Sequence, residues 1–388
     1  MTEMAIRYRG VSKVYPDGTT AVDNLDLDVP SGSLTVFVGP SGCGKTTSLR
    51  MLNRMVDPTS GVVEVNGQDV SSIPAAQLRR SMGYVMQQSG LLPHKTVEDN
   101  IATVPRLNGV SKKESRANAR ELLGSVGLDE SLATRYPAQL SGGQQQRVGV
   151  ARALAADPPV LLMDEPFSAV DPVVRQDLQH ELLDLQKRLH RTIIFVTHDI
   201  DEAILLGNRV AVFARGGRLA QYATPEELLR APADDFVADF IGRDRGFRSL
   251  SFENAAVALQ PVTVLAADTG ERTVVGPGSE NPAPWQGTGA AASSDWVLAV
   301  DERRHPLGWL PVRSGGEAAG REELRVGGTL WHEGDSLRTA LDAALSSPSG
   351  QAVAVHEDGS VAGVVPGEDV MRAIEEQRAT RHHGAEQA

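Results

Sequence analysis

The stretch from residue 39 to residue 47 carries the residue types of a phosphate-binding loop. It matches the pattern G-x-x-x-x-G-K-[ST] and consists of Gly39, Pro40, Ser41, Gly42, Cys43, Gly44, Lys45, Thr46 and Thr47. Because its glycines lack a Cβ atom, backbone N–H groups can approach phosphate oxygens closely. Lys45 adds a positive charge near the β and γ phosphates, Thr46 can place a hydroxyl on Mg²⁺, and Thr47 can reach the α phosphate. The loop therefore predicts a site for a nucleoside triphosphate.

The segments on either side of this loop fit the same interpretation. Residues 34–38 form a short apolar run rich in β-branched side chains, which is typical of a buried strand. Residues 48–53 have helix-forming side chains with apolar spacing, and such a helix would point its positive end at the bound phosphates. The alternative, a chance glycine turn before a helix, would make the agreement of the pattern with both flanks a coincidence.

Two further apolar runs end in polar residues. Residues 160–163 precede Asp164 and Glu165, and residues 193–196 lead to His198. Such runs indicate strands buried on both faces, where unpaired charge is costly. Asp164 can hold Mg²⁺, Glu165 on the other side of the strand can polarise the water that attacks the γ phosphate, and His198 can hydrogen-bond that phosphate. The alternatives are a pair of solvated loop acids and a structural histidine at a strand end.

A second helix start also carries glycines. Ser141 is a good N-cap, with Gly142 and Gly143 just inside the helix and a glutamine run from Gln144 onwards. A chain that already has a phosphate loop can use another anion-binding helix start to contact the γ phosphate of a nucleotide held by a second subunit. The alternative is an ordinary capped helix, for which the glutamine run would be an unusual choice.

Three isolated residues are weaker candidates. Tyr15, in a turn before the loop, can stack on adenine, although a lone tyrosine more often packs. Gln87 follows a short strand and can reach Mg²⁺ or the attacking water, although a glutamine there is usually solvated. Asp171 follows the paired carboxylates closely and can lie at a subunit interface.

Composition limits the class of protein. The chain has 388 residues, of which 41% are hydrophobic, so it is long enough for two or three domains with a real core. No apolar run approaches the roughly 18 residues of a membrane span, and the first residues contain no long apolar segment, so we expect neither a transmembrane helix nor a signal peptide. The single cysteine fits a reducing compartment. A net charge of −12 argues against nucleic acid as the main partner.

The spacing of apolar and helix-breaking residues predicts an α/β domain with a helical insertion. Strands are expected over residues 4–9, 22–29, 62–67 and 84–88. Helical spacing follows over residues 98–107, 112–126 and 141–155, and a helix pair is expected within residues 224–242.

Together these elements resemble an ATP-binding-cassette (ABC) ATPase subunit. The resemblance covers residues 3–245 and rests on motifs known in that family as the adenine-stacking aromatic (Tyr15), Walker A (39–47), the Q-loop (Gln87), the signature (140–144), Walker B (160–165), the D-loop (168–171) and the switch histidine (His198). It implies a P-loop ABC ATPase fold that binds ATP and Mg²⁺. The implied metal contacts are Thr46, Gln87 and Asp164, and the implied catalytic residues are Glu165, His198 and Gln87.

The resemblance also implies partners. Two ATPase subunits, a homodimer or a pair, would sandwich two ATP molecules between the Walker A loop of one subunit and the signature residues of the other, with Asp171 nearby. The signature contacts are Ser141, Gly142, Gly143 and Gln144. Closing and opening this dimer would drive an integral-membrane permease.

Three stretches are similar to the ATPases of glycine betaine, proline and choline importers, namely residues 53–61, 90–97 and 239–246. They imply ATP hydrolysis coupled to uptake of a quaternary amine or related compatible solute. The subunit would lie at the cytoplasmic face of the membrane, with an extracytoplasmic solute-binding protein as an indirect partner. Two alternatives stay open: an importer ATPase for another small polar solute such as an amino acid, and a permease-free ABC protein acting on ribosomes or DNA. Proteins of the last class usually carry two cassettes on one chain.

The rest of the chain predicts a smaller α+β domain. Residues 268–294 are rich in Gly, Pro, Ala, Ser and Thr, which is typical of a loop or linker. Hairpins are expected around residues 301–306 and 358–359, and helices over 336–345 and 368–377. We therefore divide the chain into an ATP-binding domain (1–245), a linker with the start of the next region (246–294), a regulatory or dimerisation domain (295–378) and a disordered tail (379–388).

The order helix, hairpin, helix resembles a cystathionine-β-synthase-type (CBS) module. Such modules often bind adenosine nucleotides through a Ser or Thr followed three residues later by Asp. Here Asp369 is present, but Pro366 stands where the hydroxyl should be. Nucleotide sensing and support of the dimer therefore stay open as alternatives, because a fold does not determine a function.

Overall fold

The chain was analysed as a computed structural model, which describes residues 3–87, 90–168, 170–242, 244–254, 257–277, 283–284, 295–313 and 318–385. It divides into two compact units, Met1–Arg243 and Asp244–Ala388. Within the described ranges, every helix is too short or too polar to serve as a membrane span.

The first unit contains a six-stranded sheet. Its strand order is β10 (Arg218–Ala223), β9 (Arg209–Ala214), β3 (Leu34–Val38), β8 (Thr192–Val196), β7 (Val160–Asp164) and β6 (Met82–Val85). β9 and β10 form an antiparallel hairpin, and all other neighbours are parallel. Because parallel strands end at the same edge of a sheet, the segments that follow β3, β7 and β8 are brought together there, which is where α/β proteins bind ligands.

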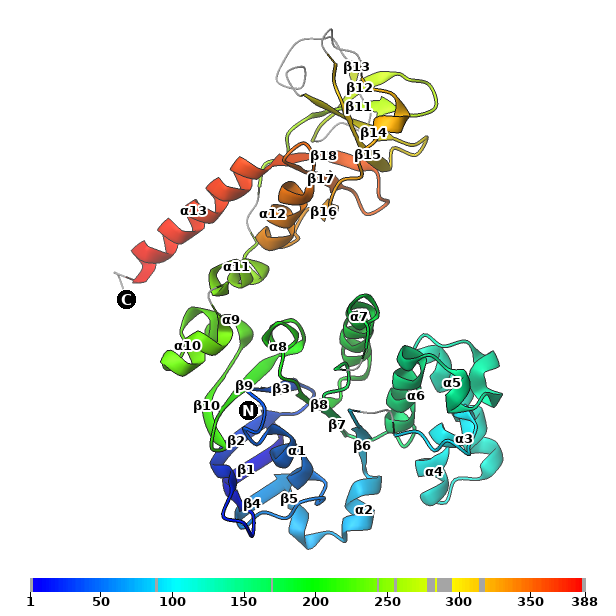
Figure 1. Cartoon of the computed structure of the whole chain (residues 1–388), viewed down its shortest axis with the longest axis vertical. Coiled ribbons are helices and arrows are strands. Elements are labelled where there is room, and N and C mark those ends of the chain that lie inside the picture. Colours follow the sequence, from blue (N-terminus) through cyan, green and yellow to red (C-terminus); the bar gives the residue numbers. More distant parts are fainter. Residues whose placement is uncertain are drawn as a thin grey trace. The chain divides into compact units, whose positions relative to one another are not determined.

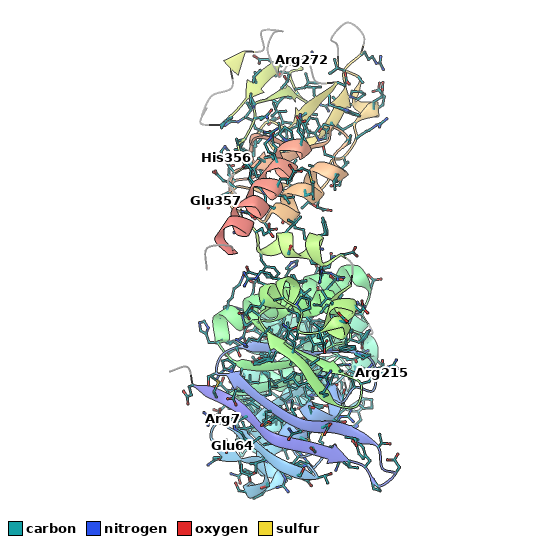
Figure 2. The ribbon with its side chains drawn as sticks, turned by 90° about the vertical axis from the view of Figure 1, so that its left-hand side faces the viewer. Arg7, Glu64, Arg215, Arg272, His356 and Glu357 are labelled. Carbon is teal, nitrogen blue, oxygen red and sulfur yellow. The ribbon has the colours of Figure 1, made fainter. Side chains whose placement is uncertain are left out.

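The second sheet of this unit is antiparallel. Its order is β2 (Thr20–Pro30), β1 (Met4–Val14), β4 (Ser60–Val65) and β5 (Gln68–Asp69). Figure 2 labels Arg7 on β1 and Glu64 on β4, which are cross-strand partners with a 3.9 Å ion pair. Asn66 and Gly67, with φ of 51° and 76°, make the turn between β4 and β5, so β4 ends two residues before the predicted strand 62–67 does.

Helices of the first unit both cover the sheet and form a lobe of their own. They are α1 (Lys45–Leu52), α2 (Ala75–Arg80), α3 (Val97–Ile101), α4 (Thr103–Leu107), α5 (Lys112–Ser125), α6 (Gly142–Leu154), α7 (Pro172–Leu189), α8 (Ile200–Leu206), α9 (Pro225–Arg230) and α10 (Asp235–Ile241), with 3₁₀ turns η1 (Val70–Ser72), η2 (Glu130–Thr134) and η3 (Pro137–Gln139). Figure 1 shows α3 to α6 gathered as one lobe to the side of the sheets. This lobe has its own apolar core, which includes Val97, Leu123 and Val148. The predicted helical insertion is confirmed.

The strands of the six-stranded sheet divide their side chains between two cores. On β7, Leu162 belongs to the core shared with the antiparallel sheet and α1, whereas Leu161 and Met163 belong to the core shared with α7 to α10. Both faces are therefore covered, which is why β3, β7 and β8 are continuous apolar runs in the sequence. The same alternation decides which way Asp164 faces at the end of β7.

The second unit contains two further sheets. The larger has the order β13 (Ala283–Pro284), β12 (Arg272–Val275), β11 (Val262–Ala266), β14 (Trp296–Val300) and β15 (Pro306–Pro311), and the smaller has β16 (Trp331–His332), β17 (Gln351–Val355) and β18 (Val361–Pro366). The helices are α11 (Arg245–Ser249), α12 (Leu337–Ser346) and α13 (Gly367–Ala385), with 3₁₀ turns η4 (Leu250–Phe252) and η6 (Arg321–Glu323). Val353 and Val355 pack with Val264 and Leu298, so one core joins the two sheets.

This unit corrects two expectations. The stretch 268–294, interpreted as a loop or linker, contributes β12 and β13, and β12 pairs with β11 over Val262 to Leu265. Its other residues lie partly outside the described ranges. The tail expected to be disordered from residue 379 is instead helical as far as Ala385, because α13 continues beyond the predicted end at residue 377. The predicted hairpins 296–312 and 352–365 are present as β14–β15 and β17–β18.

The acidic residue of the incomplete nucleotide pattern already has partners within the chain. Gln260 Nε2 donates to Asp369 Oδ2 at 2.6 Å, and Arg372 Nη1 lies 2.8 Å from Asp369 Oδ1. The backbone of Gln260 also exchanges two hydrogen bonds with Val364 on β18, of 2.8 and 2.9 Å. A ligand of Asp369 would have to compete with both side-chain contacts.

Candidate functional site

The loop between β3 and α1 has a backbone that only glycine tolerates at two positions. Gly39 has φ of 151°, and a Cβ atom there would lie 2.3 Å from the carbonyl oxygen of Phe213. Gly44 has φ of 96°, and its Cβ would lie 2.0 Å from the carbonyl oxygen of Ala21. Both distances are shorter than atoms allow, so these glycines are required by the fold as well as by ligand approach. The loop passes directly into α1, as predicted.

The Lys45 side chain is buried within this loop. Its ammonium donates to the carbonyl oxygens of Gly39 at 2.7 Å and Pro40 at 3.1 Å. Among the described residues, no carboxylate lies within ion-pair distance of Lys45. A buried ammonium that is solvated by neutral carbonyls is suited to bind an anion, because a phosphate oxygen supplies the charge that the carbonyls lack.

The other loop residues line the same turn. Ser41 and Gly42 are exposed, and Pro40 and Thr47 are half-buried. Cys43 is buried, with its Sγ 3.8 Å from the Lys45 ammonium. Burial raises the pKa of the Cys43 thiol. Cys43 is therefore a small packed residue of the loop with little thiolate character.

The loop and the end of β7 meet through a short hydrogen bond. Thr46 Oγ1 donates to Asp164 Oδ1 at 2.8 Å, across 118 residues of sequence. Asp164 is only 5% exposed. A hydroxyl and a carboxylate side by side are oxygen ligands of the kind that Mg²⁺ prefers, with the remaining positions left to phosphate and water. No cluster of three His, Cys, Asp or Glu side chains with metal-binding geometry occurs in the described part of the chain.

Glu165 faces a different partner from its neighbour Asp164. Its Oε2 lies 3.1 Å from His198 Nδ1, which follows β8, and its N–H donates to the carbonyl of Val196 at 3.0 Å. Its φ of 46° is in the left-handed region, which few glutamates adopt. Strained backbone of this kind persists where the surrounding structure holds it and is frequent at functional sites. The carboxylate and the imidazole thus come together beyond the ends of the paired strands β7 and β8, although 33 residues separate them in the sequence.

Ser141 forms a complete capping box at the start of α6. Its Oγ accepts from the N–H of Gln144 at 3.3 Å, and Gln144 Oε1 accepts from the N–H of Ser141 at 3.0 Å. Ser141 and Gly142 are exposed, and a Cβ at Gly142 would meet nothing within 4 Å. Gly142 therefore leaves open backbone at a helix start, although the Ser141 and Gln144 side chains cap each other here.

The remaining predicted site residues lie on exposed segments. Tyr15 is in the turn after β1, 37% exposed, with Lys13 Nζ 5.4 Å from its ring centroid. Gln87 is exposed two residues beyond β6, a strand that ends earlier than expected. Asp171 is exposed just before α7, and its carbonyl accepts from the N–H of Arg175. Their roles stay predictions.

Sequence reasoning missed two side chains that contact Asp164. Tyr84 donates from its hydroxyl to Asp164 Oδ2 at 3.2 Å, and Arg50 Nη2 lies 3.4 Å from the same oxygen. Burial raises the pKa of Tyr84, and the charge of Asp164 acts in the same direction. The position of Arg50 carried a signal, because it follows Thr46 by one helical turn and so shares its face of α1. Nothing local marked Tyr84.

A buried carboxylate behind His198 was also missed. Glu202 on α8 is 7% exposed and accepts from Thr197 Oγ1 at 2.5 Å and from Gln179 Nε2 on α7 at 3.1 Å. Burial is the largest cause of its raised pKa, and the nearby Asp199 adds to it. The network ties the residue before His198 to α7.

This raised pKa predicts a pH-dependent stability difference. The unfolded chain ionises at the ordinary glutamate pKa, whereas folded Glu202 holds its proton to higher pH, so its contribution is present at low pH and lost as pH rises. Glu202→Gln, which cannot ionise, should therefore gain stability relative to wild type as the pH rises above the ordinary glutamate pKa of 4.5. Thermal unfolding of both proteins at pH 4, 6 and 8 measures the gap, and a gap that shrinks as pH rises would contradict the assignment.

A glycine loop, paired carboxylates and a capped glycine helix on a largely parallel sheet with a helical lobe define an ATP-binding cassette. A family model described as ABC transporter matches residues 22–168, and the chain belongs to the ABC transporter family as an ATP-binding subunit. The predicted fold class and family resemblance are confirmed.

Relatives extend the likeness beyond the cassette. The chain is 42% identical over 354 residues to the osmoprotectant import ATP-binding protein OsmV of Salmonella typhimurium, covering 89% of this chain and 88% of that protein. It is 47% identical to the choline transport ATP-binding protein OpuBA of Bacillus subtilis, covering 67% and 69%. It is 36% identical to the glycine betaine/carnitine transport ATP-binding protein GbuA of Listeria monocytogenes, covering 92% and 88%. The first and third alignments include much of the second unit.

Solved structures resemble the first unit. A dimeric ATP-binding cassette in a post-hydrolysis state with ADP and Pi has 33% identity and a TM-score of 0.52, covering 57% of this chain and 98% of that one. The cbiO1 protein of Clostridium perfringens, part of an ABC transporter complex, has 28% identity and a TM-score of 0.55, covering 60% and 92%. Both alignments span about the length of one cassette.

Proposed function

We propose that this chain is the ATPase subunit of an importer for a quaternary amine or related compatible solute, such as glycine betaine, choline or proline. The observation that carries the proposal is the convergence of Lys45, Thr46, Asp164, Glu165 and His198 at one edge of the sheet. The cargo is supported by relatives named for osmoprotectant, choline and glycine betaine transport. An importer ATPase for another small polar solute is the second candidate, since the residues assigned in the cassette bind nucleotide and metal and do not select the transported solute.

We assign ATP and Mg²⁺ to the loop and its neighbours. The backbone of residues 39–47 cradles the phosphates, Lys45 binds the β and γ phosphates, and Tyr15 stacks on adenine. Thr46 and Asp164 hold the metal, with Gln87 as a further contact. The ion, when bound between these residues, would neutralise negative charge that develops on the phosphates during transfer.

In the proposed mechanism, Glu165 orients the attacking water and accepts its proton. Its carboxylate is held by His198 on one oxygen, which leaves the other free to accept a hydrogen bond from water. His198, 58% exposed, can turn one ring nitrogen to Glu165 and the other to the γ phosphate. We therefore expect the positions of the Glu165 and His198 side chains to differ between the ATP-bound and the ATP-free protein.

We propose that hydrolysis takes place in a pair of subunits. The open backbone at Gly142 and Gly143, with Ser141 and Gln144, would bind the γ phosphate of the partner's nucleotide, and Asp171 would lie at the interface. The pair would bind a membrane permease from the cytoplasmic side, as a peripheral protein, and serve a solute-binding protein indirectly. The acidic charge of −12 gives no support to nucleic acid as a partner.

For the second unit, we favour a role in holding the dimer together over nucleotide sensing. The carboxylate of Asp369 is held by Gln260 and Arg372, and Pro366 offers no hydroxyl. Both features leave fewer free polar groups for a nucleotide to bind at this position.

Transport tests the proposal directly. Uptake of labelled glycine betaine, choline, carnitine and proline should be measured in wild-type cells, a deletion strain, and the deletion complemented with Glu165→Gln, with and without hyperosmotic salt. We expect uptake of at least one solute to vanish in the deletion and to stay absent in the deletion complemented with Glu165→Gln. Unchanged uptake of all four, once redundant importers are deleted, would move the cargo to another small polar solute.

A further inference from the structure

The two oxygens of Asp164 are divided between different donors. Oδ1 accepts from Thr46 Oγ1 at 2.8 Å, whereas Oδ2 accepts from the Tyr84 hydroxyl at 3.2 Å and lies 3.4 Å from Arg50 Nη2. The carboxylate is almost fully buried, so water does not compete freely for either oxygen. Its orientation is therefore set by these three side chains.

Tyr84 reaches Asp164 from the neighbouring strand. β6 pairs with β7 in parallel, and Tyr84 stands opposite Leu162, two residues before Asp164 on the same face of the sheet. Its ring packs against the core shared with the antiparallel sheet and α1, a role that phenylalanine would fill equally well. The hydroxyl adds its hydrogen bond to Asp164 and an interaction with the Arg50 guanidinium.

We propose that Tyr84 is a positioning residue for the magnesium site, holding Asp164 Oδ2 so that Oδ1 faces Thr46 and the metal. The proposal rests on the proposed function, because it assumes that Asp164 is a ligand of Mg²⁺. A carboxylate that can rotate presents either oxygen to a metal, and a donor on one oxygen removes that freedom. Outer hydrogen-bond partners of this kind typically contribute roughly 10–100-fold to metal affinity.

Arg50 is less suited to this task. Its side chain is 47% exposed, and its contact with Oδ2 is longer than that of Tyr84. Solvent screens an exposed guanidinium, and a long flexible side chain loses entropy when it is held. Its positive charge also opposes a divalent cation, whereas the tyrosine hydroxyl orients the carboxylate without adding charge.

The test measures metal-dependent nucleotide binding in the full chain without turnover. In a Glu165→Gln background, a fluorescent ATP analogue is titrated in EDTA and then over a range of Mg²⁺ concentrations. For Tyr84→Phe we expect affinity in EDTA within about twofold of the parent and a Mg²⁺ concentration for half-maximal binding roughly 10-fold higher. With Mn²⁺ in place of Mg²⁺, the electron paramagnetic resonance spectrum of the bound ion in Tyr84→Phe should be broader than in the parent, because the carboxylate is no longer held in one orientation.

Tyr8→Phe is the matched control. The Tyr8 hydroxyl is also buried and donates to the carbonyl of Ser48 on α1 at 2.9 Å, but it contacts no carboxylate of the site. Its removal should leave the Mg²⁺ dependence unchanged. Arg50→Gln should shift the Mg²⁺ dependence less than Tyr84→Phe does.

Three outcomes would overturn the proposal. If Tyr84→Phe behaves as its parent while Asp164→Asn raises the Mg²⁺ requirement, the metal site stands and the tyrosine has no positioning role. If Arg50→Gln gives the larger shift, the orienting group is the guanidinium. If the parent binds no ATP, or Asp164→Asn leaves the Mg²⁺ dependence unchanged, the proposed nucleotide and metal site itself fails, and the role of Tyr84 fails with it.

Discussion

The Glu165→Gln variant should keep ATP binding within about threefold of wild type and lose hydrolysis, with kcat lower by roughly 10²–10⁴-fold, the usual contribution of a general base. The amide has the shape of the carboxylate but cannot accept the proton of the attacking water. Glu165 contacts His198 and not the loop, so the phosphate cradle should be unaffected. Steady-state phosphate release and equilibrium binding of labelled ATP measure the two quantities separately.

Glu130→Gln provides the control for this change. It makes the same carboxylate-to-amide substitution on η2 of the helical lobe, where the side chain is 68% exposed and lies 3.7 Å from Arg120. Turnover there should match wild type. Normal turnover in Glu165→Gln would show that another group activates the water.

The Lys45→Ala variant should lose most of its ATP affinity while remaining folded. Removing one charge-assisted contact costs about 2–3 kcal/mol, which corresponds to a dissociation constant roughly 30–150-fold larger. The fold should tolerate the change, because the contacts of the ammonium among the described residues are all with its own loop, the carbonyl oxygens of Gly39 and Pro40 and the Sγ of Cys43. Equilibrium titration with labelled ATP and thermal unfolding of the same samples measure affinity and folding together.

The control for Lys45→Ala is Lys187→Ala. Lys187 is 76% exposed on α7 and pairs with Asp184 on the same helix, so ATP affinity should stay at the wild-type value. An unchanged affinity in Lys45→Ala would argue against the loop as the phosphate site. A loss of affinity accompanied by unfolding would be a stability effect, which the melting curves reveal.

Much of the first unit could be predicted because its signals are local. The loop of residues 39–47 is a contiguous pattern whose glycines are required by their own backbone angles. β3, β7 and β8 are apolar runs because both faces of the sheet are covered. Ser141 indicated its helix because an N-cap bonds within its own turn.

The second unit was predicted less well, for a physical reason. β12 lies in a stretch whose composition is typical of a loop, and it becomes a strand by pairing with β11. The pairing energy of such a short strand comes from its neighbours in the sheet, which composition does not describe. α13 continues past the predicted end, and nothing in the polar residues after 377 marked that continuation.

By itself, the sequence determined the phosphate loop, the paired carboxylates and the capped helix, because each is a pattern of consecutive residues. Together these patterns determined the class of protein. Only the tertiary structure decided which of these side chains meet. Thr46 with Asp164, Glu165 with His198, and Tyr84 with Asp164 are contacts between different strands and helices across 118, 33 and 80 residues. Such contacts depend on strand order and register, which place the ends of β3, β6, β7 and β8 at one edge of the sheet.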